Sequence, residues 1–151
     1  MDSRSASSTC GSADVRIYRH PVRVHWGDLD PAKIVFYPNY FMWFDESAQL
    51  LFSSAGLGWE TLTGTHGVIG LPIVEAKARF LAPCKYHDEI VVESCVTRWN
   101  DKTFKVSHTV LNGATRAVEG YEIRAWCKPD PDRPGQLKAF AIPQEVRAAF
   151  E

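Results

Sequence analysis

Closely spaced cysteines are missing from the sequence. Its four cysteines are far apart and none belongs to a close Cys/His grouping; they are Cys10, Cys84, Cys95 and Cys127. Structural zinc sites and thioredoxin-like redox centres typically use cysteines only a few residues apart. The spacing therefore argues against both kinds of site, and we also expect no disulfide bonds.

Long apolar segments are missing as well. No run approaches the roughly 20 apolar residues that span a bilayer. Residues 1–14 contain no apolar segment of the signal-peptide type. We therefore expect no membrane partner and, by default, a reducing cytoplasmic location.

Neither sign of charge is in clear excess. Seventeen basic side chains nearly balance eighteen acidic ones, which gives a formal net charge of −1 and no electrostatic reason to expect a nucleic acid as partner. The five histidines are dispersed, and no GxSxG, HExxH or phosphate-loop pattern occurs. A serine hydrolase, a zinc protease and a nucleotidase are therefore not supported, and we expect no metal and no cofactor.

The length of 151 residues fits one domain with a single core. Residues 1–14 are small, polar and rich in serine, and such a composition buries too little apolar surface to offset the entropy of ordering it. We therefore predict a flexible tail over residues 1–14 and a single folded domain over residues 15–151.

A long helix is predicted over residues 38–55. Pro38 suits a first helical position, no further proline and no glycine interrupts the segment, and Gly56 follows as a C-cap. Its apolar residues are not confined to one stripe, because five are consecutive near the start: Tyr40, Phe41, Met42, Trp43 and Phe44. A helix that is apolar nearly all round must be covered by other elements.

Strands can supply that cover. Phe104, Val106, His108 and Val110 alternate with polar residues, which is the period of a half-buried strand. Turn signals between the later strands predict consecutive antiparallel hairpins. Strands are expected over residues 15–26, 70–81, 89–99, 104–111, 118–127 and 137–142, with a loop at 129–135. The predicted fold is α+β, an antiparallel sheet curled around one central helix, and its open edges favour pairing with a second copy.

The segment GDLDPAKIVFYPNY places two acids just ahead of the predicted helix. In an extended chain Asp28 and Asp30 point to opposite sides, and Pro31 biases Asp30 toward an extended or turn conformation. The helix N-terminus near Tyr37 carries unpaired N–H groups with partial positive charge. A carboxylate beside such donors could attack a bound carbonyl or activate water against it. The alternative is that both aspartates only shape the turn.

The run GDLDPAKIVFYPNYFMWFD closely resembles the 4-hydroxybenzoyl-CoA thioesterase family of hot-dog-fold proteins, whose motif is G-D-x-D-P-A-x-I-V-x-Y-P-N-Y. Weaker similarity continues through AGLGW, GVIGLPIV and RWNDKTF, so the resemblance covers about residues 16–142. It implies that Asp30 is the catalytic carboxylate and that the backbone N–H of Tyr37 polarises the thioester carbonyl. Asp28 is expected to keep a structural role in the turn. Whether Asp30 is a nucleophile or a general base stays open.

The resemblance also implies substrate-binding residues. Trp59 matches an aromatic residue that helps to enclose an aryl group, and an ordinary core tryptophan is the alternative. The family carries a basic run at the hairpin that corresponds to WNDKT, where it meets the phosphates of CoA. Here Lys102 and Thr103 are the candidates, and Lys102 is the single base of that hairpin. The alternative for Lys102 is a solvated turn residue.

The implied activity is hydrolysis of an aryl-CoA thioester such as 4-hydroxybenzoyl-CoA, so an acyl-CoA is the expected partner molecule. The implied assembly is a homo-oligomer, either a dimer or a dimer of dimers (a homotetramer), with active sites at the subunit interface. Three alternatives stay open: a thioesterase for short or branched aliphatic acyl-CoA, one for acyl carrier protein thioesters, and a module that binds CoA esters without hydrolysing them.

Two acids inside the predicted helix raise a competing site. Asp45 and Glu46 are adjacent, and a buried helix seldom keeps two acids without a purpose. Another branch of hot-dog thioesterases, similar in fold, places its catalytic glutamate on the central helix. The alternative, which we favour, is that both acids lie on an exposed edge of the helix.

Overall fold

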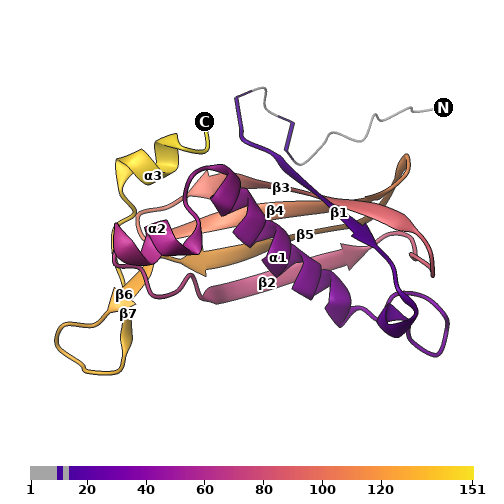
Figure 1. Cartoon of the computed structure of the whole chain (residues 1–151), viewed down its shortest axis with the longest axis horizontal. Helices are drawn as coiled ribbons and strands as arrows, with labels where there is room; N and C mark the ends of the chain where they lie inside the picture. Colours follow the sequence, from indigo (N-terminus) through magenta and orange to yellow (C-terminus); the bar gives the residue numbers. More distant parts are fainter. Residues whose placement is uncertain (1–9, 12–13) are drawn as a thin grey trace.

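The fold is built on one antiparallel sheet and one long helix (Figure 1). The computed structural model describes residues 10–11 and 14–151. Five strands form the sheet in the order β1-β3-β4-β5-β2, and each pairs with its neighbours in the antiparallel sense. Their bounds are β1 Tyr18–Arg23, β2 Ile73–Phe80, β3 Glu89–Trp99, β4 Thr103–Asn112 and β5 Thr115–Ala125. The sheet therefore has two open edges, formed by β1 and β2.

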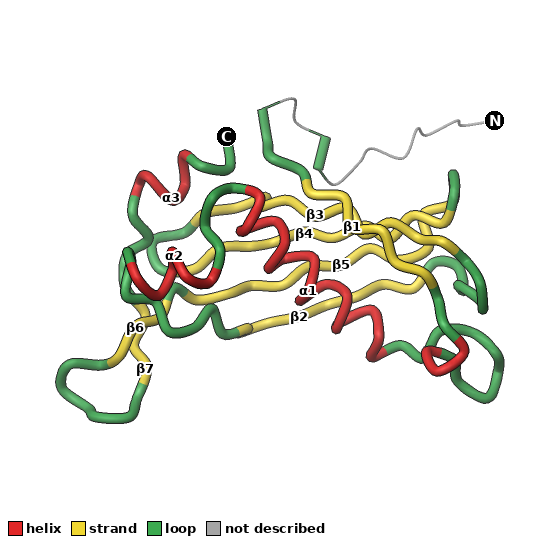
Figure 2. Tube along the Cα trace, in the orientation of Figure 1, coloured by secondary structure: helices red, strands yellow, loops and turns green. Residues whose placement is uncertain are grey.

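The long helix, α1 (Pro38–Ser54), crosses one face of the sheet, as Figures 1 and 2 show. Pro38 is its first residue, and the chain leaves it at Gly56, whose φ of 76° is left-handed and suits glycine. Seven residues of the helix are buried: Tyr40, Trp43, Phe44, Ser47, Ala48, Leu51 and Phe52. Both clusters of the hydrophobic core include side chains of α1, so this helix is the centre of the core.

The helix α1 approaches the sheet closely at Gly120 of β5. The Phe44 ring stacks on the His108 ring, with 4.5 Å between the centroids and 4° between the planes. A Cβ atom at Gly120 would lie 2.8 Å from the Phe44 ring and 2.4 Å from the Lys77 carbonyl oxygen. Only glycine leaves room here, so this position sets how deeply the helix is seated.

Shorter elements complete the chain. They are the 3₁₀ turn η1 Trp26–Asp28, the helices α2 Trp59–Gly64 and α3 Gln144–Ala148, and the hairpin strands β6 Cys127–Pro129 and β7 Leu137–Ala139. Figure 1 shows α2, α3 and the hairpin at one end of the sheet, and the N-terminus of α1 at the opposite end. Among residues 10–11 and 14–151, no helix is both long and apolar enough to cross a bilayer.

The predicted helix over residues 38–55 and the antiparallel sheet are confirmed, and three details differ. The first strand is shorter than predicted, because the chain turns into η1 at Trp26. The predicted last strand is extended only over Leu137–Ala139, and it pairs with β6 outside the main sheet. The short helices α2 and α3 are absent from the prediction, because five or six residues carry too little periodicity to be recognised.

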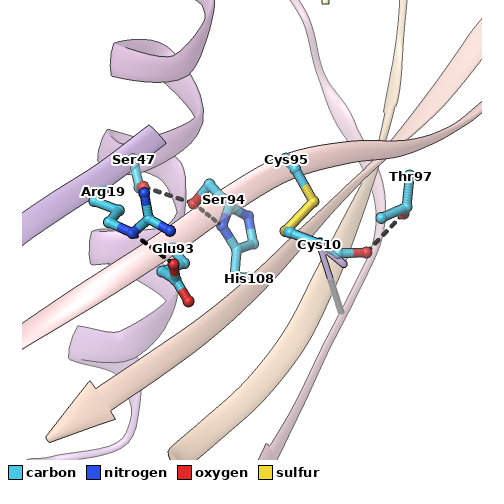
Figure 3. Close-up of a disulfide and its surroundings, with 9 residues drawn as sticks. Cys10, Arg19, Ser47, Glu93, Ser94, Cys95, Thr97 and His108 are labelled. Atoms are coloured by element: carbon cyan, nitrogen blue, oxygen red, sulfur yellow. Dashed lines mark hydrogen bonds and ion pairs between the residues drawn. A yellow bond between two sulfur atoms is a disulfide. The ribbon is translucent and has the colours of Figure 1, made fainter. Parts of the chain in front are cut away.

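The expectation of no disulfide bonds is wrong. Cys10 and Cys95 are bonded, although 85 residues separate them in the sequence (Figure 3). Ser94 of β3 bonds to Ser47 of α1, so the side chain of Cys95, the next residue of the strand, lies on the other face of the sheet. Only the folded chain brings residue 10 to that face. Of the predicted tail over residues 1–14, residues 1–9 and 12–13 lie outside the described residues.

Candidate active site

Asp30 lies in a tight turn directly after η1. Its backbone N–H donates to the carbonyl of Ile34 at 2.8 Å, and its carbonyl accepts the N–H of Lys33 at 2.8 Å. Its Oδ1 atom accepts the N–H of Ala32 at 2.8 Å. Lys33 adopts a left-handed conformation, with φ of 65°, to close the turn. The turn therefore fixes the Asp30 carboxylate through Oδ1, and no hydrogen bond joins Oδ2 to any of the described residues.

Tyr37 immediately precedes the first residue of α1. Its φ and ψ of −54° and −33° already belong to the helix. Helix starts leave their first N–H groups without intrahelical partners, and no described residue accepts the N–H of Tyr37. This N–H is therefore a donor that a bound carbonyl oxygen can use.

One cavity, of about 360 Å³, contains both residues. Its lining combines one carboxylate with mainly apolar and aromatic side chains: Asp30, Ile34, Val35, Tyr37, Tyr40, Phe80, Leu81, Ala82 and Pro83. The Phe80 ring is 6.3 Å from the Tyr37 ring and 5.8 Å from the Tyr40 ring, between centroids. The structure thus brings Asp30 and Tyr37 together, as the sequence predicts, beside a wall suited to an apolar acyl group.

The hydroxyl of Tyr40 has a buried partner. It hydrogen-bonds with the thiol of Cys84, which is fully buried. Burial raises the pKa of Tyr40 and the pKa of Cys84 above their ordinary values. Both groups are therefore neutral near pH 7, and the Cys84 thiol is a poor nucleophile. Asp30 is the one carboxylate among the described residues that line the cavity.

Asp28 has the structural contacts expected of a turn residue. Its carboxylate accepts the N–H of His25 at 2.8 Å, within the turn that η1 forms. Its carbonyl accepts the N–H of Phe36 at 2.8 Å and the Nδ2 amide of Asn39 at 2.9 Å. All of these bonds shape the loop, and Asp28 does not line the cavity.

The three predicted substrate-binding residues do not join this cavity within one chain. Trp59 begins α2 and is 51% exposed, so it is not the ordinary core tryptophan that was the alternative. Lys102 lies in the turn between β3 and β4, and Thr103 begins β4. This turn and the start of β4 lie at the end of the sheet opposite to the N-terminus of α1 (Figure 1).

Two further lysines, which the sequence prediction did not place near Lys102, lie at the same end of the sheet. Lys128 of β6 and Lys138 of β7 are opposite each other in the hairpin. Their ammonium groups lie 5.6 Å and 5.8 Å from the centroid of the Phe140 ring. The Lys102 carbonyl accepts the N–H of Trp126 nearby. The alternation in QLKAF predicts a strand that contains Lys138. The sequence does not show which strand pairs with it, so it does not predict that Lys128 lies opposite Lys138.

Asp45 and Glu46 of α1 each have a polar partner. Asp45 bonds to Arg124, and Glu46 lies 3.1 Å from His20. Neither acid lines the cavity that contains Asp30. Both are on the exposed side of the helix, which is the position that we favoured for them.

A buried polar cluster lies beneath α1. His108 accepts or donates a hydrogen bond of 2.6 Å with the Ser94 hydroxyl and is 3.4 Å from the Glu122 carboxylate. Burial lowers the pKa of His108 below its ordinary value, against the opposing effect of Glu122. His108 is therefore neutral near pH 7. In the part of the chain that the structure describes, no three His, Cys, Asp or Glu side chains gather as metal ligands.

Comparison with known proteins gives consistent matches across the domain. The profile of the thioesterase-like superfamily matches residues 24–150. The chain is 34% identical over 129 residues to 4-hydroxybenzoyl-CoA thioesterase from Pseudomonas sp. (strain CBS-3), a match that covers 82% of this chain and 89% of that protein. It is 26% identical over 128 residues to 1,4-dihydroxy-2-naphthoyl-CoA hydrolase from Thermosynechococcus vestitus, which covers 85% and 87% of the two chains.

Solved structures show the same architecture. A mutant of 4-hydroxybenzoyl-CoA thioesterase in complex with 4-hydroxybenzoyl-CoA superposes with a TM-score of 0.82 at 28% identity, over 90% of this chain and 99% of that one. A gentisyl-coenzyme A thioesterase superposes with a TM-score of 0.73 at 32% identity, over 86% and 99%. These likenesses confirm the expected α+β class and the hot-dog fold.

Proposed function

This chain belongs to the thioesterase-like superfamily and is an acyl-CoA thioester hydrolase, and from that premise we propose that its substrate is an aryl-CoA thioester such as 4-hydroxybenzoyl-CoA. The products are then the free aryl acid and CoA. The observation that supports the proposal most directly is the cavity that holds the Asp30 carboxylate, an aromatic wall and the Tyr37 N–H, which no described residue accepts.

In the proposed mechanism the thioester carbonyl oxygen binds at the N–H of Tyr37. This donor stabilises the negative charge that develops on the oxygen as the carbonyl carbon becomes tetrahedral. The partial positive charge of the α1 N-terminus adds to that stabilisation. Because the donor is backbone, its position is set by the helix start and not by a side-chain rotamer.

Asp30 can cleave the acyl–sulfur bond by either of two routes. As a nucleophile, its Oδ2 atom attacks the carbonyl carbon and CoA leaves as the thiolate; water then hydrolyses the acyl anhydride and regenerates the carboxylate. As a general base, Asp30 takes a proton from a water molecule that attacks the carbonyl carbon directly. Both routes consume one water molecule and yield the free acid and CoA.

The apolar wall is the support for an aryl substrate. Phe80, Tyr37 and Tyr40 present ring surfaces around the cavity, and aromatic rings pack well against an aryl group in edge-to-face or offset arrangements. A short or branched aliphatic acyl group could also fit an apolar wall, so a panel of acyl groups is needed to decide.

The proposed assembly joins two copies along β2. Every residue of this edge strand is exposed or half-exposed, including the apolar Val74 and Phe80. Antiparallel pairing of β2 with its symmetry mate would set the α2 end of one sheet beside the α1 N-terminus of the other. Trp59 and Lys102 of the partner subunit could then complete the cavity that contains Asp30. Two such dimers could form the expected dimer of dimers.

The dimer is tested by Val74→Lys, which places a charge in the paired edge. We expect this variant to sediment as a monomer and to lose most of its turnover. A monomeric variant with undiminished turnover would show that the site is complete in one chain.

The chemistry is tested by measuring thiol release from 4-hydroxybenzoyl-, benzoyl- and butyryl-CoA. Asp30→Asn keeps the shape of the side chain but removes the carboxylate charge, so we expect turnover to fall by at least about 100-fold, with the fold and substrate binding retained. Asp132→Asn, the same change in the exposed loop before β7, is the control and should leave turnover unchanged. Full activity of Asp30→Asn with all three substrates would exclude the mechanism, and a preference for butyryl-CoA would exclude the aryl substrate.

A further inference from the structure

Asp30 and Tyr37 stand on different segments, so their relative position depends on the contacts that join those segments. Asp30 lies in the loop after η1, whereas Tyr37 is the N-cap of α1. Misplacing one reacting group by about 1 Å can lower a rate on the order of 100-fold. The contacts that hold the loop to the first turn of α1 are therefore candidates for a role in turnover.

The carbonyl of Asp28 is where the two segments meet. It accepts two hydrogen bonds, one from the backbone N–H of Phe36 at 2.8 Å and one from the Nδ2 amide of Asn39 at 2.9 Å. Asn39 is the second residue of α1, and its own N–H donates to the Phe36 carbonyl at 3.0 Å. The Asp28 side chain is itself tied to the N–H of His25. Asp28 thus joins the loop and the helix start through its carbonyl and the exit from β1 through its carboxylate.

We propose that Asn39 is a positioning residue for thioester hydrolysis. By donating to the Asp28 carbonyl, its side-chain amide holds the N–H of Tyr37 at working distance from the Asp30 carboxylate. Asn39 does not line the cavity, so it acts through these two groups and not on the substrate. This inference rests on the proposed function, which assigns the chemistry to Asp30 and Tyr37.

The bond requires a donor at residue 39, and that requirement makes a sharp test possible. Aspartate has the same shape as asparagine, but its carboxylate offers only acceptors and would face the carbonyl oxygen of Asp28. At the same time, a negative charge in the first turn of a helix is favoured by the helix dipole. Asn39→Asp therefore removes the bond without weakening the helix.

The experiment is steady-state thiol release by Asn39→Asp, with the melting temperature measured in parallel. We expect kcat to fall about 10- to 100-fold, KM to stay within about threefold, and the melting temperature to change little. Gln49→Glu, the same amide-to-acid change on the exposed side of α1, is the matched control and should leave kcat unchanged. Asn39→Ala removes the amide without adding charge and should lower kcat similarly. A kcat within twofold of wild type in both Asn39 variants would overturn the role.

A double variant separates positioning from an independent effect. If Asn39 acts by aligning Asp30, the residual activity of Asp30→Asn should not fall further when Asn39→Asp is added. If the double variant instead loses turnover by the product of the two single-variant factors, the positioning role is overturned. Loss of turnover in Asp30→Asn with none in Asn39→Asp rejects the role of Asn39 alone. Full turnover in Asp30→Asn rejects the proposed chemistry, and the role of Asn39 falls with it.

Discussion

Arg124 is the buried cation that ties α1 to β5, and its removal tests how the central helix is held. Its side chain is 4% exposed. It donates to the carboxylate of Glu122, with 3.0 Å between Nε and Oε2, to the carbonyl of Leu71 at 3.1 Å, and to the carboxylate of Asp45. The two acids differ in solvation, because the side chain of Glu122 is 1% exposed and that of Asp45 is 54% exposed.

The difference in exposure between the two acids sets how much unfolding free energy each variant is expected to lose. Arg124→Met leaves the Glu122 carboxylate buried without its cation, and breaking a buried ion pair in this way costs about 3–5 kcal/mol of unfolding free energy. Asp45→Asn breaks the other pair of the same arginine, but Asp45 is half-exposed, so we expect a loss of at most about 1 kcal/mol. Adding Glu122→Gln to Arg124→Met removes the stranded charge and should recover more than half of the loss.

The assay is urea unfolding of the wild type, the two single variants and the double variant. All are measured at one protein concentration, because association would make the apparent stability depend on concentration. We expect the midpoint to fall strongly for Arg124→Met and only slightly for Asp45→Asn. Equal losses in these two variants, or a loss below about 1 kcal/mol in Arg124→Met, would refute the reasoning from burial. A double variant as unstable as Arg124→Met would show that the lost packing matters more than the stranded charge.

Two further predictions concern Lys102 and His108. Lys102→Ala should raise KM and leave kcat nearly unchanged, as loss of uniform binding to CoA phosphates would; an unchanged KM would make Lys102 a solvated turn residue. The lowered pKa of His108 in the folded chain means that the unfolded chain binds the extra proton as pH falls through about 6.5. Unfolding free energy should therefore be largest above that pH and decline below it, by up to about 1.4 kcal/mol per pH unit from this group. His108→Gln should show a shallower decline in urea titrations between pH 7.5 and pH 5.5, and identical slopes would contradict the prediction.

The parts of the fold and site that the sequence predicts are those with local signals. The alternation along β4 predicts the sheet that covers Tyr40, Trp43 and Phe44 of α1. The expectation that this apolar helix is covered nearly all round is wrong, because Met42 is 65% exposed. Asp30 and Tyr37 are only seven positions apart, so the turn at Pro31 and the helix start are enough to predict that the two residues lie near each other. The rest of their cavity is not local, because residues 80–83 also line it.

The parts that the sequence does not predict depend on contacts between distant segments. The bond between Asp45 and Arg124 joins residues 79 positions apart, and the disulfide joins residues 85 positions apart. Such contacts depend on strand register, and a shift of one residue moves a side chain such as Cys95 to the opposite face of the sheet. The disulfide also bears on the predicted cytoplasmic location, because such bonds are typical of oxidising compartments. That location stays a prediction.

The position of the candidate site follows from the burial of α1. Tyr40, in the first turn of the helix, is buried in the same core cluster as Val35 and Cys84. The N–H of Val35 donates to the Cys84 carbonyl at 2.9 Å, so the loop that carries Asp30 is bonded to the chain that leaves β2. The turn that carries Asp30 is thus an extension of the core and not an independent loop. A variant that loosens the seat of α1 far from the cavity, such as Arg124→Met, should therefore lower turnover as well as stability, and by more at temperatures close to its melting transition.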